Sequence, residues 1–170
     1  MRSEELKSIQ APLKARYRQE PGSALVTLSA SGALGEGVSC NVRTGRALVE
    51  AGLHPATGGT GLAACSGDML LEALAACAGV TLAAVATSLG IHVRGGSVHA
   101  EGDLDFRGTL GVEKTVPVGF QRIRVAFELD TDADDEELAT LLRLTERYCV
   151  VYQTLANPPV MTLSRQIAGA

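Results

Sequence analysis

The chain has 170 residues, 46% of them hydrophobic, but only 4% are aromatic and none is tryptophan. This length suits one domain with a sizeable aliphatic, alanine-rich core. The formal net charge of −4 gives no basic footprint for nucleic acid, and residues 1–22 lack the apolar stretch of a secretory signal.

The N-terminal part of the chain predicts a helix and three strands. Within residues 3–18 apolar side chains recur at helical spacing: Leu6, Ile9, Leu13 and Tyr17. Residues 23–34 alternate as a strand, and residues 37–52 predict two strands joined at Thr44-Gly45. We therefore expect an N-terminal helical extension over residues 1–22 and one domain over 23–170 that begins with a three-stranded meander.

A glycine-rich loop precedes the most apolar stretch, Leu70–Leu89, in which Glu72 is the one charged residue. We expect a long helix here, with Ser66 as its N-cap, Asp68 at the positive end of its dipole and Gly90 as its C-cap. A membrane span needs about 20 apolar residues, but this run lacks flanking basic and aromatic residues. We expect a buried helix of a soluble protein, covered in part by a second subunit.

The second half of the chain predicts two strands, a helix and a last strand. Residues 91–106 and 121–130 alternate polar and apolar side chains. Residues 131–159 predict a helix with an acidic start, and residues 160–167 a short strand. Four residues suit the buried side of that helix: Leu138, Leu141, Leu142 and Tyr148. This order of elements predicts an α+β fold with a mostly antiparallel sheet.

The four cysteines are Cys40, Cys65, Cys77 and Cys149, with no Cys-x-x-Cys pair and no zinc-ligand spacing. We expect a reduced, cytoplasmic setting, in which cysteines are buried filler or working thiols. Ala73, Cys77 and Thr81 form a row of small residues at four-residue spacing, which lets another backbone approach closely. The residues alone leave open whether Cys77 and Cys149 are small buried hydrophobes or reactive thiols.

Two segments carry a resemblance to a known family. The first is GGTGLAACSGDMLLEALAACAGVTLAAVATSLGI, residues 58–91, and the second is IRVAFELDTDADDEELATLLRLTERYC, residues 123–149. In this order they resemble the OsmC/Ohr family, the osmotically inducible protein C and organic hydroperoxide resistance proteins, over about residues 23–167.

The resemblance implies the OsmC-like fold, a mostly antiparallel sheet wrapped with a long central buried helix in an intertwined homodimer. It implies that Cys77 is a peroxidatic cysteine, whose thiolate attacks an organic hydroperoxide and becomes a sulfenic acid, and that Cys149 resolves it to a disulfide. A dithiol reductant of the lipoyl type would then reduce the disulfide by exchange. No cofactor, metal, nucleic acid or membrane partner is expected.

The chain departs from the family pattern at three places. Family peroxidases activate the thiol with an Arg on a Gly-rich turn, but this chain has SASGALGEG there. Arg43 and Arg46, on the strands that follow, are either substitutes for that Arg or solvated strand residues. Asp68 is the candidate carboxylate, but it lies on the opposite helix face from Cys77, so its role is a first-turn charge or a contact across the subunit interface. The second cysteine motif has the sequence CVVY instead of Cys-Pro-hydrophobic-Ser.

Other polar residues and cysteines give weaker predictions of a functional site. One strand face carries four of them, which predict a solvated face more readily than a cation site: His99, Glu101, Asp103 and Asp105. His54 is expected on a surface loop, and Cys40 in strand packing. Cys65, at the start of the long helix, is a rival reactive thiol.

The sequence leaves two candidate functions open. The first is a thiol-dependent peroxidase that reduces organic hydroperoxides, and the retention of both cysteines favours it. The second is a non-catalytic dimer that binds a small apolar ligand at the subunit interface, and the missing turn Arg and the altered second motif favour it.

Overall fold

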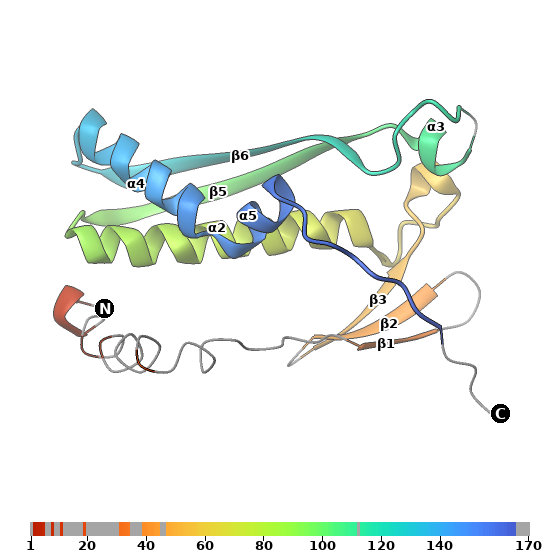
Figure 1. The fold of residues 1–170 in the computed structure, drawn as a ribbon, viewed down its shortest axis with the longest axis horizontal. Helices are drawn as coiled ribbons and strands as arrows, with labels where there is room; N and C mark the ends of the chain where they lie inside the picture. Colours follow the sequence, from red (N-terminus) through yellow and green to blue (C-terminus); the bar gives the residue numbers. More distant parts are fainter. Residues whose placement is uncertain are drawn as a thin grey trace.

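The computed structural model describes residues 2–5, 8, 11, 19, 31–34, 39–44, 47–111 and 113–165, with the backbone alone for residues 31–48. The elements in chain order are β1 (Ser31–Leu34), β2 (Ser39–Thr44), β3 (Ala47–Gly52), η2 (Pro55–Thr57), β4 (Ala64–Cys65), α2 (Ser66–Leu89), β5 (Val93–Leu104), α3 (Phe106–Thr109), β6 (Phe120–Thr131), α4 (Asp135–Tyr148) and α5 (Val150–Ala156). The α+β class is confirmed (Figure 1). Most of the helix predicted over residues 3–18, and residues 23–30 of the strand predicted over 23–34, lie outside the described residues.

A four-stranded sheet of order β1-β2-β3-β4 precedes the long helix. β1, β2 and β3 pair antiparallel, which confirms the predicted meander. β4 pairs parallel to β3, with Gly52 opposite Cys65. The sequence predicted only a loop for the segment that holds η2 and β4, because both elements are three residues or shorter.

α2 is the long helix that the sequence predicts. Gly90 ends it with a positive φ of 77°, a conformation that glycine adopts without steric cost. The predicted start is wrong: Cys65 is the N-cap, and its side chain makes no capping hydrogen bond. Ser66 is the first helical residue instead, because β4 holds the chain extended up to Cys65. Asp68 lies in the first turn, as predicted.

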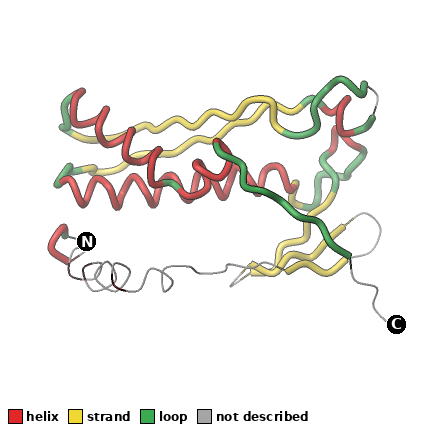
Figure 2. The backbone as a smooth tube through the Cα atoms, in the orientation of Figure 1, coloured by secondary structure: helices red, strands yellow, loops and turns green. Residues whose placement is uncertain are grey.

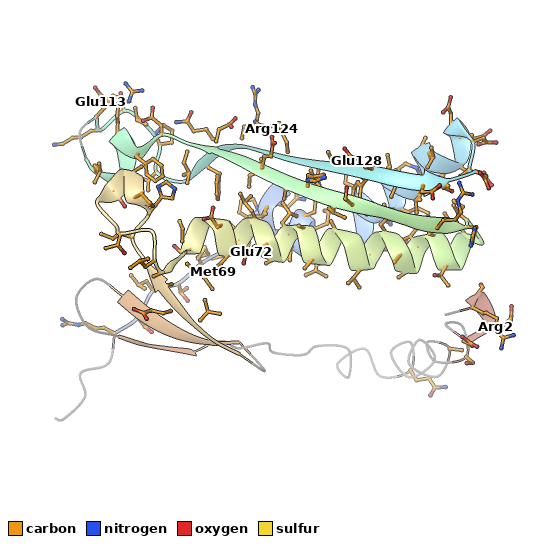
Figure 3. All side chains as sticks on the ribbon, turned by 180° about the vertical axis from the view of Figure 1, so that it is seen from behind. Arg2, Met69, Glu72, Glu113, Arg124 and Glu128 are labelled. Atoms are coloured by element: carbon orange, nitrogen blue, oxygen red, sulfur yellow. The ribbon has the colours of Figure 1, made fainter. Side chains whose placement is uncertain are left out.

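β5 and β6 form a two-stranded antiparallel ribbon whose apolar side packs on α2 and α4 (Figure 1). On its other side Arg124 bridges Glu101 at 3.2 Å and Asp103 at 2.6 Å. Figure 3 shows Arg124 on the side of the ribbon away from α2. This is the solvated face that the alternation predicts, and within the described part of the chain no cluster of three or more metal-ligating side chains occurs.

α4 begins with a capping box between Asp134 and Glu137 and packs beside α2. Leu141 is fully buried between the two helices and the ribbon. The predicted buried side is wrong at Leu142, which is 41% exposed because it lies about 100° around the helix from Leu141. It is also wrong at Tyr148, 59% exposed in the last turn before the helical region breaks.

The strand predicted over residues 160–167 is not formed over residues 160–165, the part of it that the structure describes. Residues 158–165 have no regular secondary structure and run as a loop from the end of α5 (Figure 2). Val160, Met161 and Leu163 are almost fully exposed. A strand needs a neighbour for its backbone N–H and C=O groups, and the strands described in this chain pair only with one another.

The described part of the chain covers α2 on one side only. Its buried residues face the ribbon, α4 and α5: Leu74, Ala78, Leu82 and Ala86. The other side carries a row of exposed small and apolar residues: Ala73, Ala76, Val80 and Ala83. By length and composition α2 is the one helix among the described residues that could cross a membrane. Its packing against β5, α4 and α5 is that of a core helix.

Candidate functional site

Cys77 and Cys149 meet where the middle of α2 faces the junction of α4 and α5. Cys77 is partly buried, and Cys149 is 1% exposed. Cys149 forms a buried cluster with Leu74 and Ala78, and Cys77 packs against that cluster. Helix packing therefore brings together two thiols that lie far apart in the sequence.

Cys149 is at once the C-cap of α4 and the N-cap of α5. Its N–H donates to the carbonyl of Thr145 at 2.9 Å, and its own carbonyl accepts from the N–H of Gln153 at 2.9 Å. Its extended conformation, with φ of −72° and ψ of 108°, breaks the helix. The first N–H groups of α5 consequently have no carbonyl partners within a helix, and they are directed at the two sulfur atoms.

The start of α5 sets the acidity of Cys77. Burial raises the pKa of its thiol, but hydrogen bonds from the N–H of Val151 and from the thiol of Cys149 lower it. The N–H of Val150 and the hydroxyl of Thr81 add to that effect, and the net result is a pKa below the ordinary thiol value. Each of these donors stabilises negative charge on sulfur and so favours the thiolate.

Cys149 shows the opposite balance. Burial raises the pKa of its thiol, and the neighbouring Cys77 raises it further. The N–H groups of Tyr152 and Val151 lower this pKa, but by less than burial raises it. The pKa of Cys77 therefore lies below the ordinary thiol value and that of Cys149 above it, and the Cys149 thiol donates a hydrogen bond to Cys77.

This arrangement can carry out two-step thiol oxidation. A stabilised thiolate attacks an electrophilic oxygen, and an adjacent thiol can then close a disulfide with it. Cys65, Cys77 and Cys149 form no disulfide in the structure, so both thiols of the pair are free to take part in such a cycle.

The family model described as OsmC-like protein matches residues 59–164, which is more than half of the chain. The chain belongs to the OsmC family. The match to this family spans both cysteines and the helices that carry them. None of the curated proteins compared matches the sequence.

Solved structures of OsmC-family proteins share the fold. An OsmC-like protein from Mycoplasma pneumoniae is 17% identical, with a TM-score of 0.65 over 78% of this chain and 89% of its own. An organic hydroperoxide resistance protein OsmC from Legionella pneumophila is 19% identical, with a TM-score of 0.58 over 78% and 91%. One from Elizabethkingia anophelis is 20% identical, with a TM-score of 0.57 over 78% and 91%. At these identities the likeness shows the OsmC-like fold alone.

The two other residues expected at an OsmC-family site lie elsewhere. Arg43 is on β2, which pairs with β1 and β3, and its side chain lies outside the described part of the structure. Asp68 is exposed in the first turn of α2 and lines a groove along β5 that neither Cys77 nor Cys149 borders. The single chain brings the two cysteines together, and it places Asp68 away from them.

The remaining candidates occupy structural positions. Cys65 is the partly buried N-cap of α2, and Cys40 lies on β2 with its side chain outside the described part. His54 caps η2 by accepting from the N–H of Ala56 at 3.0 Å. Its ring also stacks on Phe106, with 4.9 Å between the ring centroids.

The sequence did not single out the backbone donors at Val150 and Val151. One signal was present in the CVVY motif, where valine stands in the place of the family proline and supplies an N–H that proline lacks. The row of small residues through Cys77 was the other signal. It predicted a close backbone approach, and the backbone at the start of α5 approaches the row at Cys77, whereas Ala73 of the same row is exposed.

Proposed function

We propose that this protein is a thiol-dependent peroxidase that reduces organic hydroperoxides, with Cys77 as the peroxidatic and Cys149 as the resolving cysteine. The observation that carries the proposal is the contact between two unbonded thiols whose pKa values are shifted in opposite directions. A purely structural cysteine pair does not require thiol pKa values that are shifted in opposite directions. The names of relatives as organic hydroperoxide resistance proteins support the same assignment.

The first step is attack by the Cys77 thiolate on the terminal oxygen of the hydroperoxide. The sulfur–oxygen bond forms, the O–O bond breaks, and the alkoxide leaves with the bonding electron pair. The thiol of Cys149 donates a hydrogen bond to Cys77, so it supplies the proton that turns the alkoxide into an alcohol. Cys77 is now a sulfenic acid, and Cys149 has become a thiolate.

The second step closes the disulfide. The Cys149 thiolate attacks the sulfur of the Cys77 sulfenic acid, and hydroxide leaves and takes a proton to become water. A dithiol then restores both thiols by exchange. Because the cycle requires reduced thiols at its start, it suits a reducing compartment, and we place it in the cytoplasm.

The surroundings of the two sulfurs favour an apolar substrate. Val98, Ala100 and Leu155 are among the partly buried side chains packed against the cysteine cluster. Apolar walls gain free energy by removing alkyl groups from water, and hydrogen peroxide has no alkyl group. We therefore assign alkyl or lipid hydroperoxides as the substrate class.

The active form is proposed to be a homodimer. One side of α2 exposes an apolar row in the single chain, where Val80 is 72% exposed. Val160, Met161 and Leu163 are also exposed, in a segment without a neighbouring strand. Exposed apolar surface of this extent is typical of a subunit interface, and a second copy of α2 can pack closely on a row of small residues.

The test is titration of the reduced protein with one equivalent of cumene hydroperoxide, followed by peptide mapping of the cysteine states. A Cys77–Cys149 disulfide, absent in Cys77→Ser, is the expected result. Cys65→Ser is the matched control and should leave the disulfide intact. If both thiols stay reduced while the peroxide persists, the protein is instead a non-catalytic member of the family that binds an apolar ligand.

A further inference from the structure

A groove with a volume of about 390 Å³ runs between the first half of α2 and β5. Two kinds of side chain line it, apolar ones from Leu71, Ala75, Val98 and Ala100, and polar ones from Asp68, Glu72, His99 and Glu101. A water molecule occupies about 30 Å³ in the liquid, so the groove has room for a few long side chains. Its chemistry suits a segment that is apolar along one line and positively charged along the next.

Two carboxylates of the groove carry negative charge that the described residues do not balance. Glu101 pairs with Arg124 at 3.2 Å. Among the described residues, however, no lysine or arginine lies within ion-pair distance of Asp68 or Glu72. Both are exposed, and they lie four residues apart, so one face of α2 presents two negative charges about 6 Å apart along its axis. A partner with two cations at the same spacing would match them.

The N-terminal extension, residues 1–22, is the basic part of the chain. It holds five lysines and arginines against three carboxylates, in a chain whose formal net charge is −4. In the helix predicted for this extension, Lys14 and Arg18 share one face because they lie four residues apart. Leu13 and Tyr17 share the neighbouring face at the same spacing. All four lie outside the described residues, and their pattern supplies the basic line and the apolar line that suit the groove.

The described residues of the extension lie away from the groove of their own chain. Figure 3 shows Arg2 toward the opposite end of α2 from Glu72. In a two-fold dimer whose α2 helices pack antiparallel, the end of one α2 lies beside the start of the other. Antiparallel packing is also the arrangement that helix dipoles favour. The extension of one subunit then comes to the groove of its partner.

We infer that this groove binds the N-terminal extension of a second copy of the chain. The inference rests on the proposed homodimer and not on the thiol chemistry. The partner's Lys14 and the partner's Arg18 form ion pairs with the two unbalanced carboxylates of α2. The partner's Leu13 and the partner's Tyr17 lie on the apolar part of the groove. The two-fold axis repeats the contact, so each subunit holds the other, through an extension that lies outside the residues matching the OsmC family model.

The first experiment identifies the chain that supplies the extension. Two variants are co-expressed with different C-terminal tags and purified over both tags, so that only mixed dimers are retained. Lys14→Gln/Arg18→Gln keeps the groove and loses the basic line, whereas Asp68→Asn/Glu72→Gln keeps the extension and loses the charged groove. A carbodiimide, which joins a lysine to a carboxylate in contact with it, is then applied to the mixed dimer and to the wild-type protein. The cross-linked peptides are mapped by mass spectrometry.

We expect both samples to give a peptide that joins Lys14 to Asp68 or Glu72, because in the mixed dimer this bond can form only between subunits. A cross-link in the wild type alone means that the extension binds its own chain, which overturns the inference. A wild-type dimer without this cross-link overturns it too and leaves the homodimer in place. If wild-type chains with the two tags are not retained together, the homodimer and the inference both fail. The titration with cumene hydroperoxide tests the peroxidase proposal separately.

The second experiment reverses the charges of the extension. Lys14→Glu/Arg18→Glu places negative charge against the groove, and Lys114→Glu/Arg122→Glu is the matched control, with the same change of net charge at two exposed positions. Exposed ion pairs are individually weak and are screened by salt, so we expect the reversal to raise the Kd of the dimer roughly tenfold at low salt and less at high salt. Changing both groove carboxylates to lysine in the same chain should restore most of the affinity. An equal Kd for the reversed variant and the control, or no recovery, contradicts the inference.

Discussion

Two helices of this protein begin in the same way and differ in what faces them. α2 and α5 each have a cysteine as N-cap, Cys65 and Cys149, and neither side chain makes a capping hydrogen bond. Both cysteines are extended, so both helices start with free backbone N–H groups. At α5, however, a second segment presents the sulfur of Cys77 to those groups.

The difference indicates that the N–H groups of a helix start lower the pKa of a thiol only when another element brings its sulfur to them. α5 has just seven residues, and its first N–H groups act because α2 packs against it. α2 is far longer, yet among the described residues no second cysteine packs against Cys65. We therefore expect the contact between elements, and not the length of a helix, to decide which cysteine reacts.

The largest expected effect comes from Cys77, whose sulfur α2 presents to the start of α5, and the control is Cys65 at the start of α2. Cys77→Ser removes the thiolate and should reduce peroxide consumption on the order of a thousandfold or more, as loss of a nucleophile does. Cys65→Ser should leave the rate unchanged. The measurement is consumption of cumene hydroperoxide coupled to dihydrolipoamide oxidation. A large loss in Cys65→Ser would show that the start of α2 is the reactive one and would reverse the comparison.

The next effect concerns the N-cap of α5. Cys149→Ser removes the resolving thiol, so the first turnover should proceed and the following ones should stop. Cys77 should then accumulate as a sulfenic acid, detected by mass after dimedone labelling. Burst kinetics with one equivalent of peroxide consumed per chain is the expected signature. Steady turnover by this variant would mean that the reductant attacks the sulfenic acid directly and that Cys149 has no resolving role.

The sequence predicted elements better than it predicted contacts. The apolar run of α2 and the alternation of β5 and β6 were sufficient, because both patterns report burial within one element. The break at Cys149 was missed, since Leu141 to Leu155 keeps helical spacing through it and one extended residue leaves no periodic trace. The strand expected over residues 160–167 was wrong because an apolar alternating pattern does not supply a pairing partner. The cysteine pair itself followed from family resemblance and not from spacing.

A smaller effect tests the backbone donors at both helix starts. Val150 is the first residue of α5 and 70% exposed, and Cys149 before it is extended, so Val150→Pro removes one N–H without disturbing the helix. The pKa of Cys77 should rise, because a donor to the thiolate is lost. Ser66→Pro makes the same change at the first position of α2 and should not affect Cys77.

The measurement is the rate of Cys77 alkylation by iodoacetamide as a function of pH. Because the pKa of Cys77 is lowered, its curve should rise at lower pH than that of an ordinary thiol, near pH 8.5. Val150→Pro should move the curve to higher pH and slow alkylation at neutral pH roughly threefold to tenfold. Identical curves for Val150→Pro and Ser66→Pro would show that the start of α5 contributes nothing that the start of α2 does not.

The smallest effect comes from the hydroxyl that donates to Cys77 within α2. Thr81→Val removes the weakest of the interactions that lower the pKa of Cys77, so alkylation at neutral pH should slow by about twofold, the low end for one net hydrogen bond. Thr87→Val is the matched control on the same helix, because the Thr87 hydroxyl donates to the carbonyl of Ala83 at 2.8 Å and not to a cysteine. A loss in Thr81→Val larger than that in Val150→Pro would mean that α2 activates its own cysteine. The N-terminus of α5 would then be a neighbour of the thiolate and not the reason for it.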